Sequence, residues 1–278
     1  MRSGRLLVVL ALAALVLPTL ACQSGGSAPA PAVSEQDDVH RIVASGRLRV
    51  GMSGVQPPLN MRDKAGALIG LDVELAQALA DAMDLELVLV ERPFGSLLEG
   101  LADDEFDLVI SSLTITPARN ARVAFVGPYL ISGATMLTRQ ELVEELGEIE
   151  ALDSADRTWG ALEGSTGAEL IQEVFPQATL VTTEDLASLI PQVAAGEIDG
   201  LVSDLPYIRF ALARHPDSGL AMLPSPFTTE PLGVALSPDS PLFANLVQNY
   251  LNTLEYTGQL IQMKARWLNP GEWLSEIP

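Results

Sequence analysis

Hydrophobic and polar positions along the first half of the chain alternate between the periods of strands and helices. Leu71, Leu75, Leu79 and Ala82 recur at helical spacing, whereas the segment LELVLVE alternates as a strand does. Short apolar runs bounded by polar residues complete this half. The pattern predicts strands at 47–52, 85–91 and 108–112, and helices at 70–84 and 94–101.

The second half repeats this alternation without a fixed-period repeat. Leu186, Leu189, Ile190 and Val193 mark a helix that should end near Gly196. The pattern predicts strands at 158–162, 179–183, 200–204 and 232–236, helices from 168, at 186–196 and at 205–215, and two closing helices. Alternating strands and helices imply an α/β fold with largely parallel sheets covered by helices.

Polar side chains stand where several predicted strands end. Ligand sites in α/β sheets form at these carboxyl ends. The candidates come from both halves of the chain, and they are Ser111, Ser112, Thr114, Ser165, Thr166 and Asp204. This distribution predicts one site between two lobes rather than two independent sites.

The N-terminal segment has the features of an export signal. Arg2 and Arg5 precede an apolar run at 6–17, which suits a signal-peptide core and is short for a membrane-spanning helix. Cys22, the only cysteine in the chain, follows a small residue at the cleavage position and resembles the cysteine of a bacterial lipoprotein signal. We expect residues 1–21 to be removed and Cys22 to be lipidated; an incidental cysteine after an ordinary signal is the alternative.

The segment that follows predicts a tether. Residues 22–38 include the sequence QSGGSAPAPAVS, which is rich in Gly, Ser, Ala and Pro and cannot bury a core. A lipid anchor with a tether predicts an exported protein on a membrane, in the periplasm or on the outer face of the cell membrane. No later segment of the sequence has an apolar run long enough to span a bilayer.

Charge and motif content exclude several classes of function. The formal net charge is −20, and it becomes −22 when Arg2 and Arg5 leave with the signal (−20 − 2). Such a balance argues against a nucleic-acid partner, because phosphate binding needs clustered Lys and Arg. The sequence has no nucleophile elbow, P-loop or Cys/His metal pattern. We therefore expect no cofactor, no metal and no catalytic residue.

The candidate residues include an oppositely charged pair that suits a free amino acid. Its carboxylate needs a guanidinium and hydroxyl donors, and its ammonium needs an acidic side chain, because an enclosed unpaired charge is costly. Arg119 with Thr114 and Thr166 can serve the carboxylate, and Asp204 the ammonium. A surface arginine, turn-capping threonines and a helix N-cap aspartate are the ordinary alternatives, which the chemistry alone leaves open.

Six sequence segments, taken in their order along the chain, indicate a family. They are GRLRVGMSGVQPPLNMRDKAGALIGLD at 46–72, FDLVISSLTITPAR at 106–119, FVGPY at 125–129, LEGSTG at 162–167, EIDGLVSD at 197–204 and GQLIQMKARW at 258–267. Together they resemble the amino-acid-type extracellular solute-binding proteins (family 3) of bacterial ABC transporters, in particular the glutamine- and lysine/arginine/ornithine/histidine-binding members. The resemblance implies a type II periplasmic-binding-protein fold, in which two lobes, each a sheet flanked by helices, enclose a ligand cleft.

The resemblance also implies roles at the matching positions. Arg119 would bind the ligand carboxylate and Asp204 the α-ammonium. Phe94 matches an aromatic residue that packs on the ligand side chain, and a core phenylalanine is the alternative. Four hydroxyl side chains would flank the ligand: Ser112 and Thr114 from the first lobe, and Ser165 and Thr166, which would contact the carboxylate, from the second.

The chain departs from the family at two ligand positions. Family members commonly carry an acidic residue at the position of Ser53 and an aromatic residue at that of Gln56. The lost anion argues against a basic ligand, and Gln56 offers hydrogen bonds in place of a π face. Both departures favour a polar or neutral amino acid. Glu163 adds a carboxylate nearby in the sequence.

The resemblance further predicts capture by closure of the lobes. Lobe 1 would comprise 39–132 and 233–278, and lobe 2 residues 133–232, with hinges near 133–137 and 231–234. The ligand would favour the closed state, because only that state completes both sets of contacts, and an ABC permease would recognise it.

We expect a monomer that binds its ligand and is not an enzyme. Two other functions stay open. One is an enzyme like the periplasmic cyclohexadienyl dehydratases, which act on prephenate or arogenate and would need a general acid such as Glu163. The other is a receptor that presents its closed form to a signalling partner.

Overall fold

A computed structural model of the chain describes residues 38–145, 151–269, 271–275 and 277. The chain divides into two units, 1–34 and 35–278, and all described residues belong to the second. The predicted signal peptide, Cys22 and nearly all of the predicted tether therefore lie outside the described residues. Within the described residues, every helix is too short or too polar to cross a bilayer.

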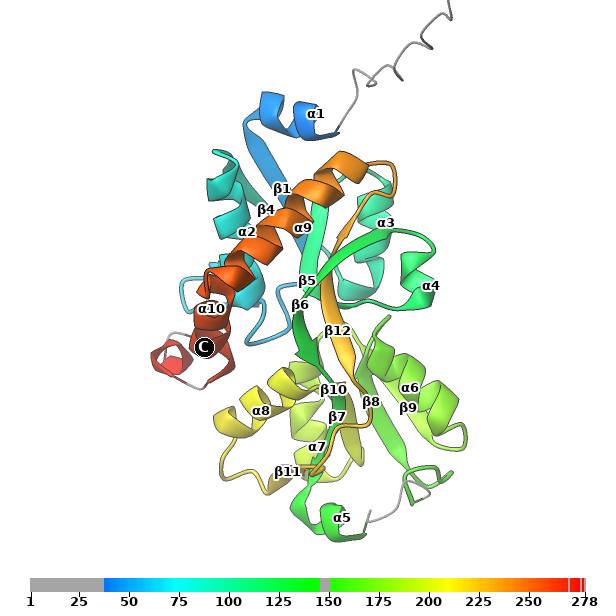
Figure 1. Ribbon diagram of the computed structural model, residues 1–278. Coiled ribbons are helices and arrows are strands. Elements are labelled where there is room, and N and C mark those ends of the chain that lie inside the picture. Colours follow the sequence, from blue (N-terminus) through cyan, green and yellow to red (C-terminus); the bar gives the residue numbers. More distant parts are fainter. Residues whose placement is uncertain (1–37, 146–150, 270, 276, 278) are drawn as a thin grey trace, which may run out of the picture. The chain divides into compact units, whose positions relative to one another are not determined.

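Two five-stranded sheets carry the fold (Figure 1). The first sheet has the order β4-β1-β5-β12-β6, with bounds Glu86–Glu91, Arg47–Met52, Leu108–Thr114, Glu230–Leu236 and Ala124–Ser132. The second has the order β11-β7-β10-β8-β9, with bounds Leu220–Met222, Ala134–Arg139, Gly200–Asp204, Thr158–Leu162 and Thr179–Thr183. Strands β2 (Met61–Arg62) and β3 (Leu68–Ile69) form a small separate ladder. The predicted α/β architecture, with one sheet in each of two lobes, is confirmed. These two lobes are called the two halves of the molecule below.

Each sheet is mixed, whereas the sequence predicted largely parallel sheets. Strands β4, β1 and β5 run parallel, as do β9, β8 and β10. The remaining strands β12, β6, β7 and β11 pair antiparallel with their neighbours. The prediction was wrong here because it missed β6, β7 and β11. Strand β6 leads through Gly133 into β7, which belongs to the other sheet, so the two strands are consecutive in the chain but do not pair with each other.

The chain crosses between the sheets twice. The first crossing is at Gly133, inside the predicted hinge at 133–137. The second lies between β11, which ends at Met222, and β12, which begins at Glu230. Residues 230–232 already pair with β6 in the first sheet, so this crossing precedes the predicted hinge at 231–234 and the predicted lobe boundary at 232/233.

Helices flank the sheets and carry the expected start and stop signals. Pro117, Pro206 and Pro241 stand in the first turns of α4, α8 and α9, where a missing N–H costs nothing. Gly196, with φ of 77°, ends α7 as predicted. The helices are α1 (Asp38–Ser45), α2 (Leu71–Ala82), η1 (Phe94–Ser96), α3 (Leu97–Ala102), α4 (Pro117–Asn120), α5 (Gln140–Glu145), α6 (Thr166–Val174), η3 (Leu186–Ser188), α7 (Ile190–Ala195), α8 (Leu205–Arg214), α9 (Pro241–Tyr256), α10 (Gln259–Leu268) and η4 (Glu272–Ser275).

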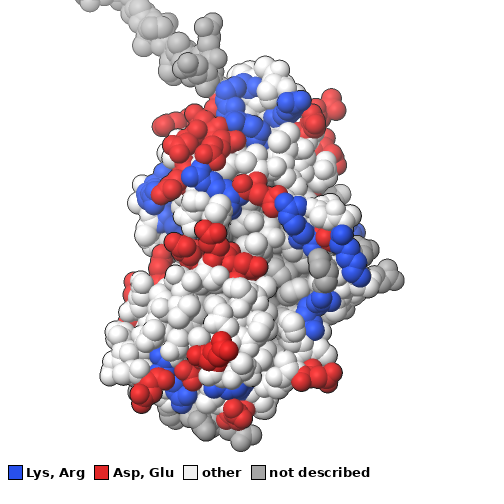
Figure 2. Space-filling model, turned by 180° about the vertical axis from the view of Figure 1, so that it is seen from behind, with Lys and Arg blue, Asp and Glu red and all other residues white. Residues whose placement is uncertain are grey.

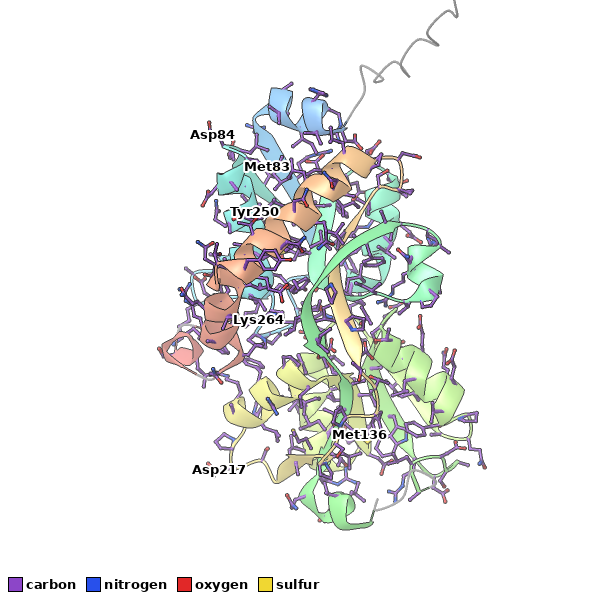
Figure 3. All side chains as sticks on the ribbon, in the orientation of Figure 1. Met83, Asp84, Met136, Asp217, Tyr250 and Lys264 are labelled. Atoms are coloured by element: carbon purple, nitrogen blue, oxygen red, sulfur yellow. The ribbon has the colours of Figure 1, made fainter. Side chains whose placement is uncertain are left out.

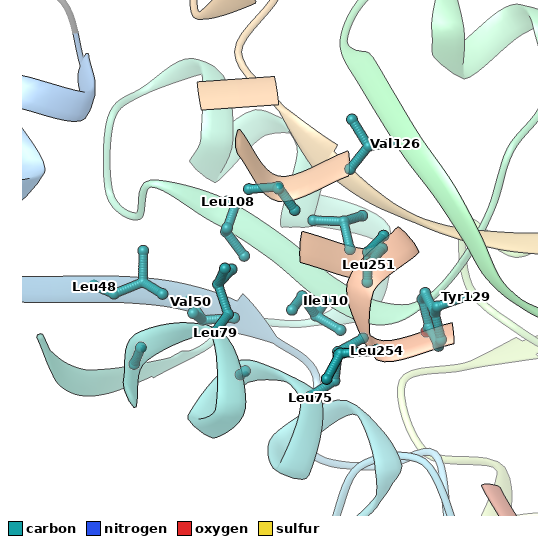
Figure 4. Close-up of a cluster of buried hydrophobic side chains, with 14 of the residues drawn as sticks. Leu48, Val50, Leu75, Leu79, Leu108, Ile110, Val126, Tyr129, Leu251 and Leu254 are labelled. Carbon is teal, nitrogen blue, oxygen red and sulfur yellow. The ribbon is translucent and has the colours of Figure 1, made fainter. Parts of the chain in front are cut away.

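One face of the first sheet packs against α2 and α9 (Figure 4). Leu75 and Leu79 of α2 and Leu251 and Leu254 of α9 meet the strand residue Ile110 in this core. Each such side chain contributes about 1.5–3 kcal/mol through burial. The same interface continues at the surface, where Tyr250 donates a hydrogen bond of 2.8 Å to the carbonyl of Ala78 (Figure 3).

A second core links the other face of the first sheet to the second sheet. It joins Phe106 and Val109 beside α3 to Leu137, Leu201 and helices α7 and α8. A third core covers the opposite face of the second sheet and contains Met136 (labelled in Figure 3) and the fully buried Trp159. Strand β5 is buried along its whole length, which agrees with the apolar run LVI at its start.

Charged side chains cover much of the surface of the described body. On the face drawn in Figure 2, Asp and Glu gather in several clusters with Lys and Arg scattered among them. Within the described residues, no group of three or more His, Cys, Asp or Glu side chains is arranged to hold a metal ion.

Candidate functional site

A cleft between the two sheets collects most of the predicted ligand residues. Strands β5, β8 and β10 end at this place, which is why polar residues that follow strands meet there. Seven of the nine predicted ligand residues line the cleft, and they are Gln56, Phe94, Ser112, Thr114, Ser165, Thr166 and Asp204. The two others, Arg119 and Ser53, are buried next to the cleft but do not belong to its lining.

Arg119 belongs to the short helix α4, which follows β5. Its side chain is buried, and its guanidinium joins the two sheets: Nη1 donates to the carbonyl of Thr114 at 3.0 Å and Nη2 to that of Gly164 at 2.9 Å. The guanidinium carbon lies 5.8 Å from the ring centroid of Phe94, within cation–π range. Burial lowers the pKa of Arg119, and nearby carboxylates, that of Glu169 foremost, oppose this shift. These contacts exclude the alternative that Arg119 is an ordinary surface arginine.

Asp204 ends β10 and occupies the N-cap position of α8. It makes no side-chain capping hydrogen bond there. Its Oδ1 accepts a hydrogen bond of 3.0 Å from the Ser132 hydroxyl instead, across the junction of the sheets. Burial, followed by the neighbouring carboxylate of Glu230, raises the pKa of Asp204 to about 7. The side chain is thus directed to the cleft and not to its helix.

Glu230 is a cleft residue that the sequence analysis missed. Its side chain is buried, and its Oε2 accepts hydrogen bonds from the hydroxyls of Thr114 at 2.6 Å and Thr166 at 2.7 Å. Its Oε1 accepts from the Thr228 hydroxyl at 3.0 Å. The residue opens β12, beside β5 and β6, and only this pairing brings it to the cleft. An acidic residue before an apolar strand is no signal by itself, so the sequence could not have identified it.

Gln56 lines the cleft, and its side-chain oxygen, Oε1, is a buried hydrogen-bond acceptor without a donor among the described residues. Buried polar atoms are nearly always paired, so this oxygen calls for a donor from a ligand or solvent. Ser53 lies deeper: its hydroxyl donates to Asn60 Oδ1 at 3.0 Å, and its backbone N–H donates to the Ser111 hydroxyl at 3.0 Å.

Asp72 holds the floor of the cleft in position. This fully buried residue at the start of α2 accepts hydrogen bonds of 2.7 Å from the Tyr129 hydroxyl and the Asn60 amide, and of 2.9 Å from the Ser112 N–H. Burial raises the pKa of Asp72, and these donors oppose the shift. Ser112 has a positive φ of 51°, a strained conformation for a serine that these bonds help to hold.

Glu163 does not reach the cleft. It is exposed and lines a neighbouring crevice with Glu99 and Glu184. Phe94 and Leu162 line both spaces, so the crevice adjoins the cleft. Ser165 serves as the N-cap of α6, where its hydroxyl accepts from the Ala168 N–H at 3.2 Å, and it lines the cleft as well.

The loops on either side of the cleft touch at two glycines. A Cβ placed on Gly164 would lie 2.6 Å from the Cα of Gly95, and Gly164 has a φ of 72°. Both the contact and the backbone conformation therefore require glycine.

The arrangement defines a binding protein of two α/β halves with a polar, charged cleft, and comparison with known proteins agrees. Residues 48–270 match the bacterial extracellular solute-binding proteins, family 3, and the chain belongs to this family. The fold is that of the type II periplasmic amino-acid-binding proteins, as predicted.

Individual relatives include binding proteins and an enzyme. A cyclohexadienyl dehydratase of Pseudomonas aeruginosa is 28% identical over 84% of this chain and 87% of its own. The ABC transporter arginine-binding protein 1 of Escherichia coli is 25% identical over 81% and 91%. The solved structure of a putative binding component of an ABC transporter from Wolinella succinogenes, complexed with lysine, is 33% identical with a TM-score of 0.78, over 83% and 99%.

The raised pKa of Asp204 predicts a pH-dependent stability. An unfolded aspartate titrates near about 3.9. Between about pH 4 and pH 7 the unfolded chain has lost a proton that folded Asp204 still holds. Stability therefore falls as pH rises through this window.

Asp204→Asn removes this titration. The melting temperature of the variant minus that of the parent should increase by roughly 10 °C between pH 4 and pH 7 and level off by about pH 8. Thermal unfolding of both proteins across pH 4–8 measures the difference. Two curves that run parallel throughout would show that Asp204 titrates normally.

Proposed function

We propose that the protein captures a free amino acid in the cleft between its sheets. The observation that carries this proposal is a hydroxyl-lined cleft between the two sheets that has the carboxylate of Asp204 in its lining and the buried guanidinium of Arg119 directly behind it, bonded to the carbonyl of the lining residue Thr114. A zwitterion needs both charges at once. Enclosing it without either partner would cost several kcal/mol per ion.

The role of each residue in ligand binding follows from the motif in which it lies. Arg119 binds the ligand carboxylate, with hydroxyls from Ser112, Thr114, Ser165 and Thr166 close by. Asp204 accepts from the α-ammonium, and Phe94 packs on the side chain. Opening requires the contacts of Arg119 and Thr166 with the opposite half to break, and the ligand favours closure because it contacts both halves.

The family supports a role in transport. Its relatives include binding proteins of amino-acid ABC transporters. We propose that this chain delivers its ligand to an ABC permease, with residues 1–21 as the signal peptide and Cys22 as the lipid-anchored start of the mature protein. A Cys22→Ser chain should leave the membrane fraction of the producing bacterium, whereas the parent should stay in it.

An enzyme is the second candidate, and two observations favour it. A cyclohexadienyl dehydratase is among the relatives, and an aspartate whose pKa is near 7 can act as a general acid at neutral pH. Glu163, the acid that the sequence suggested, lines the crevice outside the cleft. In such an enzyme Asp204 would have to act as the general acid instead of Glu163.

Loss of either charge of the clamp should weaken binding strongly. Arg119→Ala and Asp204→Ala should each reduce ligand affinity by about 2–5 kcal/mol, because each leaves one ligand charge enclosed and unpaired. The ligand is first found by a thermal-shift screen of the common amino acids on protein stripped of carried-over ligand. Titration calorimetry then measures the variants.

Arg122→Ala is the matched control, since Arg122 is an exposed arginine three residues beyond Arg119. It should bind as the parent does. Parent-like affinity in both clamp variants would refute the assignment of Arg119 and Asp204. A screen in which no amino acid shifts the melting temperature would refute the proposed function.

The two candidate functions differ in a direct assay. With prephenate or arogenate as substrate, the protein should form neither phenylpyruvate nor phenylalanine above the rate in buffer. Formation that disappears in Asp204→Asn would establish the enzyme instead, since an amide cannot act as the acid.

A further inference from the structure

Glu230 adds a negative charge to the cleft that the family motifs do not reveal. Three hydroxyl groups donate to its carboxylate, those of Thr114, Thr166 and Thr228. Thr114 comes from β5 of the first sheet and Thr166 from α6 beside the second. The carboxylate is therefore fixed between the two halves and cannot turn away without losing all three bonds.

The formal charges at the cleft do not balance. A bound ligand ammonium favours the ionised form of Asp204. In that state Arg119 contributes +1 and Asp204 and Glu230 contribute −1 each, which leaves −1 among these three groups (1 − 2). In the part of the chain that the structure describes, neither carboxylate forms an ion pair with Lys, Arg or His. The Arg119 guanidinium donates to the carbonyls of Thr114 and Gly164 instead.

A zwitterion with a neutral side chain would leave this imbalance enclosed. An amino acid with one further positive charge would cancel it, and uncompensated charge in a closed site is costly. The hydrogen-bonding groups are compatible with such a ligand, because the buried Oε1 of Gln56, which has no partner among the described residues, can accept from an N–H group. Ser53 and Gln56 considered alone favour a polar or neutral ligand. When the carboxylate of Glu230 is included, a positively charged ligand is favoured instead.

Thr114 and Thr166 give a second argument. They are the hydroxyls that the family motifs place near a ligand carboxylate, and both donate to one oxygen of Glu230. A ligand carboxylate must therefore share or take over these donors beside an existing anion. Ligands with surplus negative charge, including dicarboxylates, are disfavoured most.

We propose that Glu230 is the residue that determines ligand charge, and that it selects an amino acid with a basic side chain and a net charge of +1. This inference rests on the proposed amino-acid function. It assigns the substrate class to a residue outside the motifs that define the family.

The test uses arginine and citrulline, which have nearly the same shape and differ by one positive charge. Titration calorimetry on the stripped protein should give an arginine affinity at least about tenfold above that for citrulline. In Glu230→Gln the ratio of the two affinities should fall by about tenfold. Gln keeps an acceptor oxygen for Thr114 and Thr166, so the geometry of the cleft is retained.

Glu255→Gln is the control, because Glu255 is an exposed glutamate on α9 and its loss removes the same charge from the whole protein. Its ratio should equal that of the parent. An unchanged ratio in Glu230→Gln would overturn the assignment of Glu230. Citrulline binding as tightly as arginine to the parent would overturn the charge selection, even if Glu230→Gln did not fold. If neither ligand nor any other amino acid binds, the proposed function itself fails.

Discussion

The two hydrogen bonds to Oε2 of Glu230 connect the halves of the molecule. Thr114 belongs to the first sheet and Thr166 to the helix beside the second, yet both donate to the same oxygen. Arg119 adds a parallel connection through the carbonyl of Gly164. Because these polar groups are enclosed, each must be paired, and separating the two halves would leave them without these partners.

The cleft is a site where the cost of burying charge is used for selection. Asp204 shows this cost directly, since burial and the Glu230 carboxylate raise its pKa to about 7. A cationic group that enters would favour the ionised carboxyl and offset the repulsion between the two acids. The same arrangement opposes anions, which is the physical basis of the charge selection proposed for Glu230.

The family establishes the fold, but it does not fix one activity. Relatives with similar architecture include an arginine-binding protein and a dehydratase. Function therefore follows from the few side chains at the cleft. Asp72 supports these side chains from below, because it ties α2, β5 and β6 together through Asn60, Ser112 and Tyr129.

The sequence determined what depends on local pattern. The periods of the apolar residues predicted β1, α2, β8 and β10, and the motifs marked Arg119, Asp204 and the hydroxyls beside them. Tertiary structure alone decided the rest: the antiparallel β6 and β7, the start of β12 ahead of the predicted hinge, and the outward place of Glu163. Glu230 shows why, since its neighbours Thr114 and Thr166 are 116 and 64 residues away, and no local pattern records such a distance.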